Sequence, residues 1–188
     1  MNNSNYSSSD KFLHNLFLGN TDLANFLYER IKKYEKSDKK FFKIFITGLA
    51  RSGTTSLLNQ LFITDEFGSL KYSHMPFILN PRLSKIFSSF SKKGEIKSQE
   101  RIHKDGINIS INSPECLDEP FWIKENSNYF SEELTTKRKY SEATLDNYNK
   151  FLNRHCLFQD RSKFIIKNNN NHLRLEQLCN FFKDDLFI

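Results

Sequence analysis

Residues Gly48–Thr55 (GLARSGTT) follow an apolar run and are typical of a loop that binds a phosphate group. Glycines let the backbone turn tightly enough for N–H groups to converge, and the start of a following helix adds partial positive charge. The spacing of Gly48 and Gly53 is that of a Walker A loop. However, Thr54 stands where that motif has its lysine, and the positive charge comes earlier, at Arg51. The expected phosphate-binding residues are Gly48, Arg51, Ser52, Gly53, Thr54 and Thr55.

Proton transfer requires a base, and the sequence offers several candidates. His74 follows a short predicted strand, and an ordinary histidine pKa near 6.5 suits a base at neutral pH, so we favour it. His103, Asp105 and Glu119 remain alternatives. Lys167 ends an apolar strand, and ligands of parallel α/β sheets bind at such strand ends, so it is a candidate for contacting a ligand.

The elements that would position these residues alternate between strands and helices. Predicted strands are 41–47, 70–73, 163–167 and the beginning of one more at 185–188. Predicted helices are 54–62, 81–90, one begun by Ser113-Pro114-Glu115, one capped by Ser141, and 172–182. Leu145, Tyr148, Leu152 and Cys156 share one face of the helix after Ser141, and Leu175, Leu178, Cys179 and Phe182 point inward. This alternation predicts an α/β fold with a central parallel sheet.

The domain organisation follows the composition along the chain. Residues 1–40 are expected to form a polar tail and a helical lead-in, and residues 41–188 the α/β domain. The segment 91–100 is polar and is expected to be an exposed loop. The chain stops on the apolar residues Leu186, Phe187 and Ile188, where a central strand should lead into a ligand-binding loop. We therefore expect a truncated or shortened domain.

Composition narrows the classes of function. The 188 residues carry 28 Lys+Arg and 22 Asp+Glu, a net charge of +6 that is spread along the chain. This excess suits an anionic small ligand, and no aromatic and basic RNA-binding motif accompanies it, so nucleic-acid binding is disfavoured. The three cysteines have neither zinc nor disulfide spacing, and no metal site is expected. The absence of an apolar leader and of a run of about 20 apolar residues predicts a cytoplasmic chain without a transmembrane segment.

The loop resembles the 5′-phosphosulfate loop of sulfotransferases that use PAPS (3′-phosphoadenosine 5′-phosphosulfate), which commonly reads Gly-x-Pro-Arg-Ser-Gly-Thr-Thr. This chain has Ala50 in place of the proline. Residues 71–77 (KYSHMPF), 101–122 and 167–175 (KNNNNHLRL) also resemble blocks of a bacterial sulfotransferase family. The resemblance covers roughly residues 41–188.

The resemblance implies a three-layer P-loop fold and transfer of a sulfuryl group from PAPS to a hydroxyl or amine, with no metal. The acceptor would be a small molecule or a glycan. Arg51 would neutralise the phosphosulfate, Lys167 would stabilise the transition state, and His74 would be the base. The family's 3′-phosphate contacts would lie beyond Ile188, so none is assigned here.

Two other functions remain open. A nucleotide kinase or NTPase with a degenerate loop is disfavoured by the missing lysine, since that lysine contacts the terminal phosphates. A non-catalytic phosphate-binding module would keep the loop and lack the 3′-phosphate site.

Overall fold

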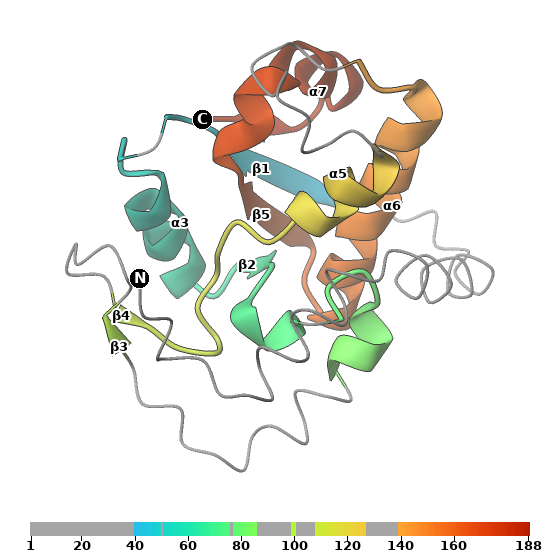
Figure 1. Ribbon diagram of the computed structural model, residues 1–188. Coiled ribbons are helices and arrows are strands. Elements are labelled where there is room, and N and C mark those ends of the chain that lie inside the picture. The colour runs from blue at the N-terminus through green and yellow to red at the C-terminus, as the bar shows by residue number, and fades with distance from the viewer. Residues whose placement is uncertain (1–39, 50, 76, 86–98, 101–107, 127–138) are drawn as a thin grey trace, which may run out of the picture.

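The computed structural model describes residues 40–49, 51–75, 77–85, 99–100, 108–126 and 139–188. Its central element is a parallel sheet in the order β2-β5-β1-β6 (Figure 1). The strands are β1 (Phe42–Ile46), β2 (Phe67–Ser69), β5 (Lys163–Lys167) and β6 (Leu186–Phe187). β1 pairs with β5 on one side and with β6 on the other, and β5 pairs with β2. The predicted α/β fold with a central parallel sheet is confirmed.

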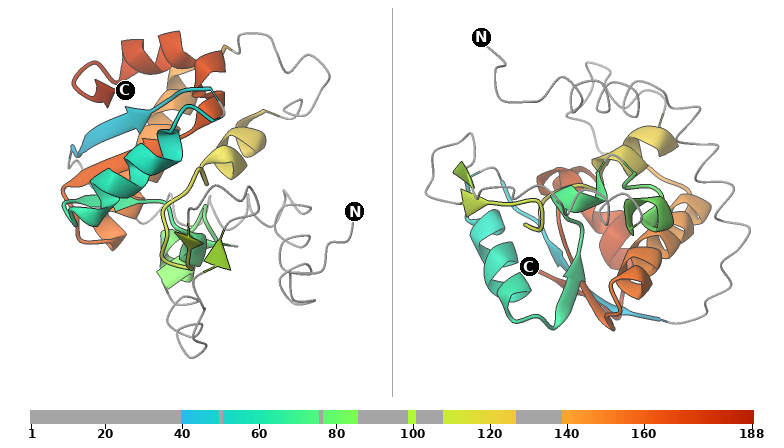
Figure 2. Two further views of the ribbon diagram at one scale, coloured as in Figure 1. Left: turned by 90° about the vertical axis from the view of Figure 1, so that its left-hand side faces the viewer. Right: turned by 90° about the horizontal axis from the view of Figure 1, so that it is seen from below.

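Helices cover both faces of this sheet and make it the middle of three layers (Figure 2). α3 (Thr54–Ile63) packs on one face, where its Leu58 meets Ile44, Ile46 and Ile165. α5 (Glu119–Glu125), α6 (Glu142–Phe158) and α7 (Leu175–Phe181) pack on the other. Alternate residues of a strand point to opposite faces, so β1 serves both cores.

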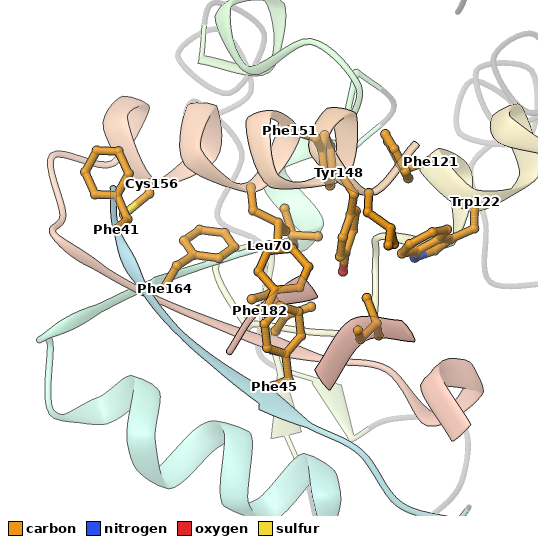
Figure 3. Packing of buried hydrophobic residues seen from close by; sticks show 14 of the residues in the cluster. Phe41, Phe45, Leu70, Phe121, Trp122, Tyr148, Phe151, Cys156, Phe164 and Phe182 are labelled. Carbon is orange, nitrogen blue, oxygen red and sulfur yellow. The ribbon is translucent and has the colours of Figure 1, made fainter. Parts of the chain in front are cut away.

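The larger core is rich in aromatic side chains (Figure 3). Phe45 and Phe164 contribute from the sheet, and Phe121, Tyr148 and Phe151 from the helices above it. These five side chains are fully buried. Burying an aromatic side chain of this size stabilises a fold by roughly 1.5–3 kcal/mol. Because the larger of the two hydrophobic clusters lies on this face of the sheet, this face contributes most of the stabilisation from apolar burial.

The second predicted strand was misplaced. The sequence pattern predicts a strand at 70–73, whereas β2 ends at Ser69 and Tyr72–His74 form a 3₁₀ turn, η1. The His74 ring explains the turn, because its Nδ1 accepts a hydrogen bond from the Lys71 N–H at 3.1 Å. Leu70 is nevertheless 1% exposed, so its apolar character reflects burial rather than a strand.

The predicted helix start at Ser113-Pro114-Glu115 is also wrong. Pro114 forms an antiparallel bridge with Lys71, and the Glu115 N–H donates to the Leu70 carbonyl. Tertiary pairing with residues 70–72, which follow β2, therefore overrides the local capping signal. The helix begins later, at Glu119, with Pro120 in its first turn. Glu119 thus lies at the start of α5.

The later elements follow the prediction more closely. Ser141 caps α6 by accepting from the Thr144 N–H at 3.1 Å, and the predicted inward face of α6 is buried. The predicted helix over 172–182 is divided into a 3₁₀ turn, η2 (Asn169–Leu173), and α7. Leu178 on α7 and Phe182 directly after it are buried as predicted, whereas Leu175 and Cys179 are exposed.

The remaining predictions fall partly outside the described residues. Residues 81–85 are helical, and the rest of the predicted helix over 81–90 is not described. Gln99–Glu100 form β3, which pairs antiparallel with β4 (Asn108–Ile109), so the predicted loop over 91–100 ends in a strand. The tail and lead-in at 1–39 lie outside the described residues. None of the helices in the described ranges is long and apolar enough to cross a membrane.

Candidate phosphate-binding site

The loop between β1 and α3 has a backbone that suits a phosphate-binding turn. Gly53 has φ +83° and precedes the first residue of α3, and Arg51 has φ +71°, a conformation that costs a non-glycine residue energy. A Cβ added at Gly48 would lie 2.7 Å from Ser52 Oγ and 3.0 Å from Thr54 Cγ2, so a side chain here would displace these two loop side chains. The loop therefore holds a close turn that a glycine makes possible.

The start of α3 favours an anion. The first backbone N–H groups of a helix have no partner within the helix, and the helix dipole makes this end positive. Within the described part of the chain, no side chain caps α3 and no acidic residue lies in its first turn. Arg51 is exposed beside this end. Ser52 is exposed as well, and its Oγ donates to the Leu49 carbonyl at 2.7 Å.

The end of β5 lies directly beside the loop. Lys167 is the register partner of Ile46, the last residue of β1, and the next residue, Asn168, donates its N–H to the Ile46 carbonyl. Asn169 accepts a hydrogen bond from Thr54 Oγ1 at 3.3 Å. The sheet therefore brings Lys167 to the same edge as the predicted phosphate-binding residues.

Lys167 forms a nearly buried ion pair at this edge. Its ammonium donates to Glu115 Oε1 at 2.9 Å, and the two side chains are 9% and 14% exposed. The same oxygen accepts from the Cys116 N–H. Glu115 reaches this place because residues 113–115 pair with residues 70–72, the same contact that replaces the predicted helix start.

Behind Lys167, the fully buried Asn168 amide joins two carboxylates. Its Nδ2 donates to Asp118 Oδ1 at 2.9 Å and to Glu119 Oε1 at 2.6 Å, and its Oδ1 accepts from the Asn170 N–H. Arg174 also donates to Glu119, at 3.0 Å, and its guanidinium lies 4.1 Å from the centre of a Trp122 ring. The network anchors α5 to the end of β5.

Asp118 is the most enclosed acid of this network. Its Oδ2 accepts from Tyr148 Oη at 2.6 Å and from Trp122 Nε1 at 3.1 Å. Burial raises the pKa of Asp118, with the Glu119 charge acting in the same direction, although Arg174 and the hydrogen bonds oppose the shift. Burial and the Asp118 charge together raise the pKa of Tyr148, so the phenol stays a donor.

His74 has a different environment. Its ring packs against that of His155, with ring centres 5.1 Å apart, and lines a cavity beside β2 to which neither the loop nor Lys167 contributes. Burial, with the charges of His155 and Lys71, lowers the pKa of His74 to about 2. Because Nδ1 accepts from the Lys71 N–H, the neutral ring carries its proton on Nε2 and acts there as a donor.

The structure thus brings together Gly48, residues 51–55, Lys167 and Glu119 at or near one sheet edge. His103 and Asp105, the other candidate bases, lie outside the described residues. Sequence reasoning missed Glu115 and Asp118 as members of the site. Asp118 and Glu119 directly precede Pro120, and this pattern is a sequence signal for a helix start. No local pattern indicated that Glu115 pairs with Lys167.

Comparisons with known proteins show the fold. No family model matches the chain, and no curated protein matches it significantly. Among solved structures, the chain is similar to the sulfotransferase STF1 from Mycobacterium tuberculosis, with a TM-score of 0.58 and 17% sequence identity. The match covers 92% of this chain and 52% of the mycobacterial chain, so this chain spans about half the length of that protein. The chain therefore has a sulfotransferase-like α/β fold.

Proposed function

We propose that this chain carries the phosphosulfate-binding part of a cytoplasmic sulfotransferase that takes its sulfuryl group from PAPS. The acceptor would be a hydroxyl or amine of a small molecule or glycan. PAPS supplies an activated sulfuryl group whose departure leaves charge on the 5′-phosphate. The observation that carries the proposal is the convergence, at one sheet edge, of a lysine-free phosphate loop containing Arg51 with the strand-end Lys167.

The residues present fit such a ligand. Gly48 leaves the turn without a side chain, α3 begins with no acid in its first turn, and Arg51 is exposed beside it. Arg51 would bind the 5′-phosphate, together with backbone N–H groups at the start of α3 and the hydroxyls of Thr54 and Thr55. Lys167 would stabilise charge that develops on the sulfuryl oxygens, as fixed cations do in phosphoryl transfer.

Two residues compete for the role of base. His74 is the residue favoured by sequence, yet its Nδ1 is engaged and its low pKa makes it a weak proton acceptor. Glu115 lies beside Lys167 at the end of β5, whereas His74 lines a separate cavity, so we propose Glu115 as the base. A base of this kind contributes about 10²- to 10⁴-fold to turnover, so E115Q should lose that factor while H74Q retains activity.

The cofactor is tested by calorimetric titration with PAP, the 3′,5′-bisphosphate product, against 5′-AMP. PAP binding at least about tenfold more tightly than 5′-AMP would support PAPS use and would show that a 3′-phosphate site lies within these residues. We expect Arg51→Ala to weaken PAP binding by roughly 10- to 100-fold, as expected for loss of a charge-assisted hydrogen bond. Lys150→Gln is the matched control, because Lys150 is an exposed cation of α6 that pairs with Asp146.

Other outcomes would favour the other functions. Equal, weak binding of PAP and 5′-AMP would indicate a phosphate-binding module and contradict PAPS use. ATP turnover that requires Mg²⁺ would revive the nucleotide kinase or NTPase. A folded sample that binds neither nucleotide would overturn the proposal.

A further inference from the structure

A cavity of about 480 Å³ lies beside β2, the edge strand of the sheet. Its walls come from the turn between α3 and β2, from η1, from residues 81–85 and 110–112, and from the end of α6. Neither the phosphate loop nor Lys167 lines it. Small-molecule sites commonly have volumes of about 300–1,000 Å³, so this cavity is large enough for a ring compound of modest size.

The charged side chains in the described lining of this cavity already have partners. Arg161 is paired with Asp65. The Lys71 ammonium lies over the Phe62 ring, 5.4 Å from its centre, and Lys85 also has an interaction partner. An ionic ligand would therefore give up its hydration without meeting an uncompensated charge among these residues, which disfavours its binding.

Two imidazole rings add to the uncharged part of the wall. Burial lowers the pKa of His74 to about 2 and that of His155 to about 4, so both rings are neutral at physiological pH. His155 donates from Nε2 to the Ile78 carbonyl at 2.7 Å. His74 accepts at Nδ1 from the Lys71 N–H, so its proton is on Nε2, and no acceptor for that proton lies among the described residues. His74 therefore offers the cavity an uncharged hydrogen-bond donor.

Three phenylalanines supply apolar surface in the same cavity. Phe62, Phe67 and Phe158 line it and are only partly buried. Covering apolar surface of this kind with an apolar ring is favourable because it removes that surface from water. Ring surface with a small number of placed polar groups is typical of small-molecule sites.

We propose that this cavity is a second binding site, separate from the phosphate loop, for an uncharged ring compound that carries a hydrogen-bond acceptor such as a carbonyl group. The ring would cover the exposed parts of the phenylalanine side chains, and the carbonyl oxygen would accept from Nε2 of His74. The proposal does not depend on the sulfotransferase assignment, because none of the cavity's lining belongs to the loop.

Equilibrium dialysis of the full chain at pH 7.5 with three probes tests the ligand class. The probe 2-acetonaphthone has a ring and a carbonyl, naphthalene has the ring alone, and 2-naphthoate has the ring and a negative charge. We expect 2-acetonaphthone to bind about three- to tenfold more tightly than naphthalene, as expected for one hydrogen bond, and more tightly than 2-naphthoate. Equal affinity for naphthalene would overturn the role of His74. Equal or higher affinity for 2-naphthoate would overturn the preference for an uncharged ligand, and a folded sample that binds no probe would overturn the site.

A histidine variant tests the hydrogen bond. His74→Phe keeps a ring and removes both nitrogens, so it should bind 2-acetonaphthone no more tightly than naphthalene. His172→Phe is the matched control, because His172 is exposed on η2 and does not line the cavity. It should keep the full preference for 2-acetonaphthone, and the same preference in His74→Phe would contradict the proposal.

A second variant locates the site even if His74→Phe fails to fold. Asn112 is exposed and lines the cavity, so Asn112→Trp should fill it and weaken the binding of 2-acetonaphthone and of naphthalene more than tenfold. Arg51→Ala should leave the binding of both probes unchanged. Loss of binding in Arg51→Ala with retention in Asn112→Trp would place the ligand at the phosphate loop and overturn the proposal.

Discussion

Replacing Asn168 with aspartate should destabilise the protein in a strongly pH-dependent way. The side chain keeps its shape, but the amide group that donates to Asp118 and Glu119 becomes an acceptor. Three carboxyl groups would then meet with their oxygens at the present distances of 2.9 and 2.6 Å. We expect Asn168→Asp to unfold, or to lose most of its stability, at pH 7.5 and to recover at pH 5.

The distances between the carboxyl oxygens set the size of the expected loss of stability. Like charges about 3 Å apart repel by roughly 5 kcal/mol at an effective dielectric constant of about 20. Protonating one carboxyl relieves the repulsion and costs about 1.4 kcal/mol for each pH unit above its ordinary pKa, or roughly 5 kcal/mol at pH 7.5. Repulsion in the folded state raises the pKa of the new carboxyl. The variant therefore keeps its free energy of unfolding below the pKa that this carboxyl has in the unfolded state, and it loses that free energy as the pH rises through the pKa of the folded state. Moving from pH 7.5 to pH 5 should therefore restore roughly 3 kcal/mol.

Urea denaturation of Asn168→Asp and Asn168→Ala at both pH values provides the test. The alanine variant loses two hydrogen bonds to carboxylates, about 3 kcal/mol or more in total, and gains no charge, so the change in its deficit with pH should be small. The aspartate variant should be the less stable of the two at pH 7.5, and the difference should close at pH 5. Equal stability of the two variants at both pH values would refute the carboxylate network around Asn168.

Three further predictions concern other parts of the fold. Lys43 is buried, its ammonium is 4.0 Å from the Asp185 carboxylate, and burial lowers its pKa despite that attraction. The double variant Lys43→Met with Asp185→Asn, which keeps the acceptor for the backbone N–H of residue 43, should therefore be nearly neutral in guanidinium denaturation. Lys43→Met alone should cost about 3–5 kcal/mol, because it leaves the Asp185 charge uncompensated; a double variant as unstable as the single one would contradict this reasoning. Gly48→Ala should weaken PAP binding about tenfold, measured by calorimetry, because the new Cβ meets Ser52. Ser141→Ala should lower the free energy of unfolding by about 1 kcal/mol, measured in urea, through loss of a helix cap.

The parts of the fold that sequence predicts are those whose signals are local. β1, the glycine loop and α3 form one continuous pattern of an apolar run, close turn and helix, and each was placed within a residue or two. The Ser141 cap and the buried face of α6 depend equally on neighbouring residues along the chain. Lys167 was placed correctly at a strand end for the same reason.

The parts that sequence misses depend on partners far along the chain. Pro114 has the local surroundings of a helix start, but its bridge to Lys71 places the segment against the end of β2. That pairing brings Glu115 to Lys167, which no local pattern could indicate. The prediction that His74 is the base used only its residue type and position, and its burial against His155 depends on the packing of α6.

The sheet order has a consequence for synthesis on the ribosome. β1 is translated well before its neighbours on both sides, β5 and β6, which follow only from Lys163 onward. Until they arrive, an apolar strand has both hydrogen-bonding edges open, and pairings between such distant segments form slowly. Nascent chains paused before Lys163 should therefore bind chaperones or aggregate. The sensitivity of β1 to protease should fall only once β6 has left the exit tunnel.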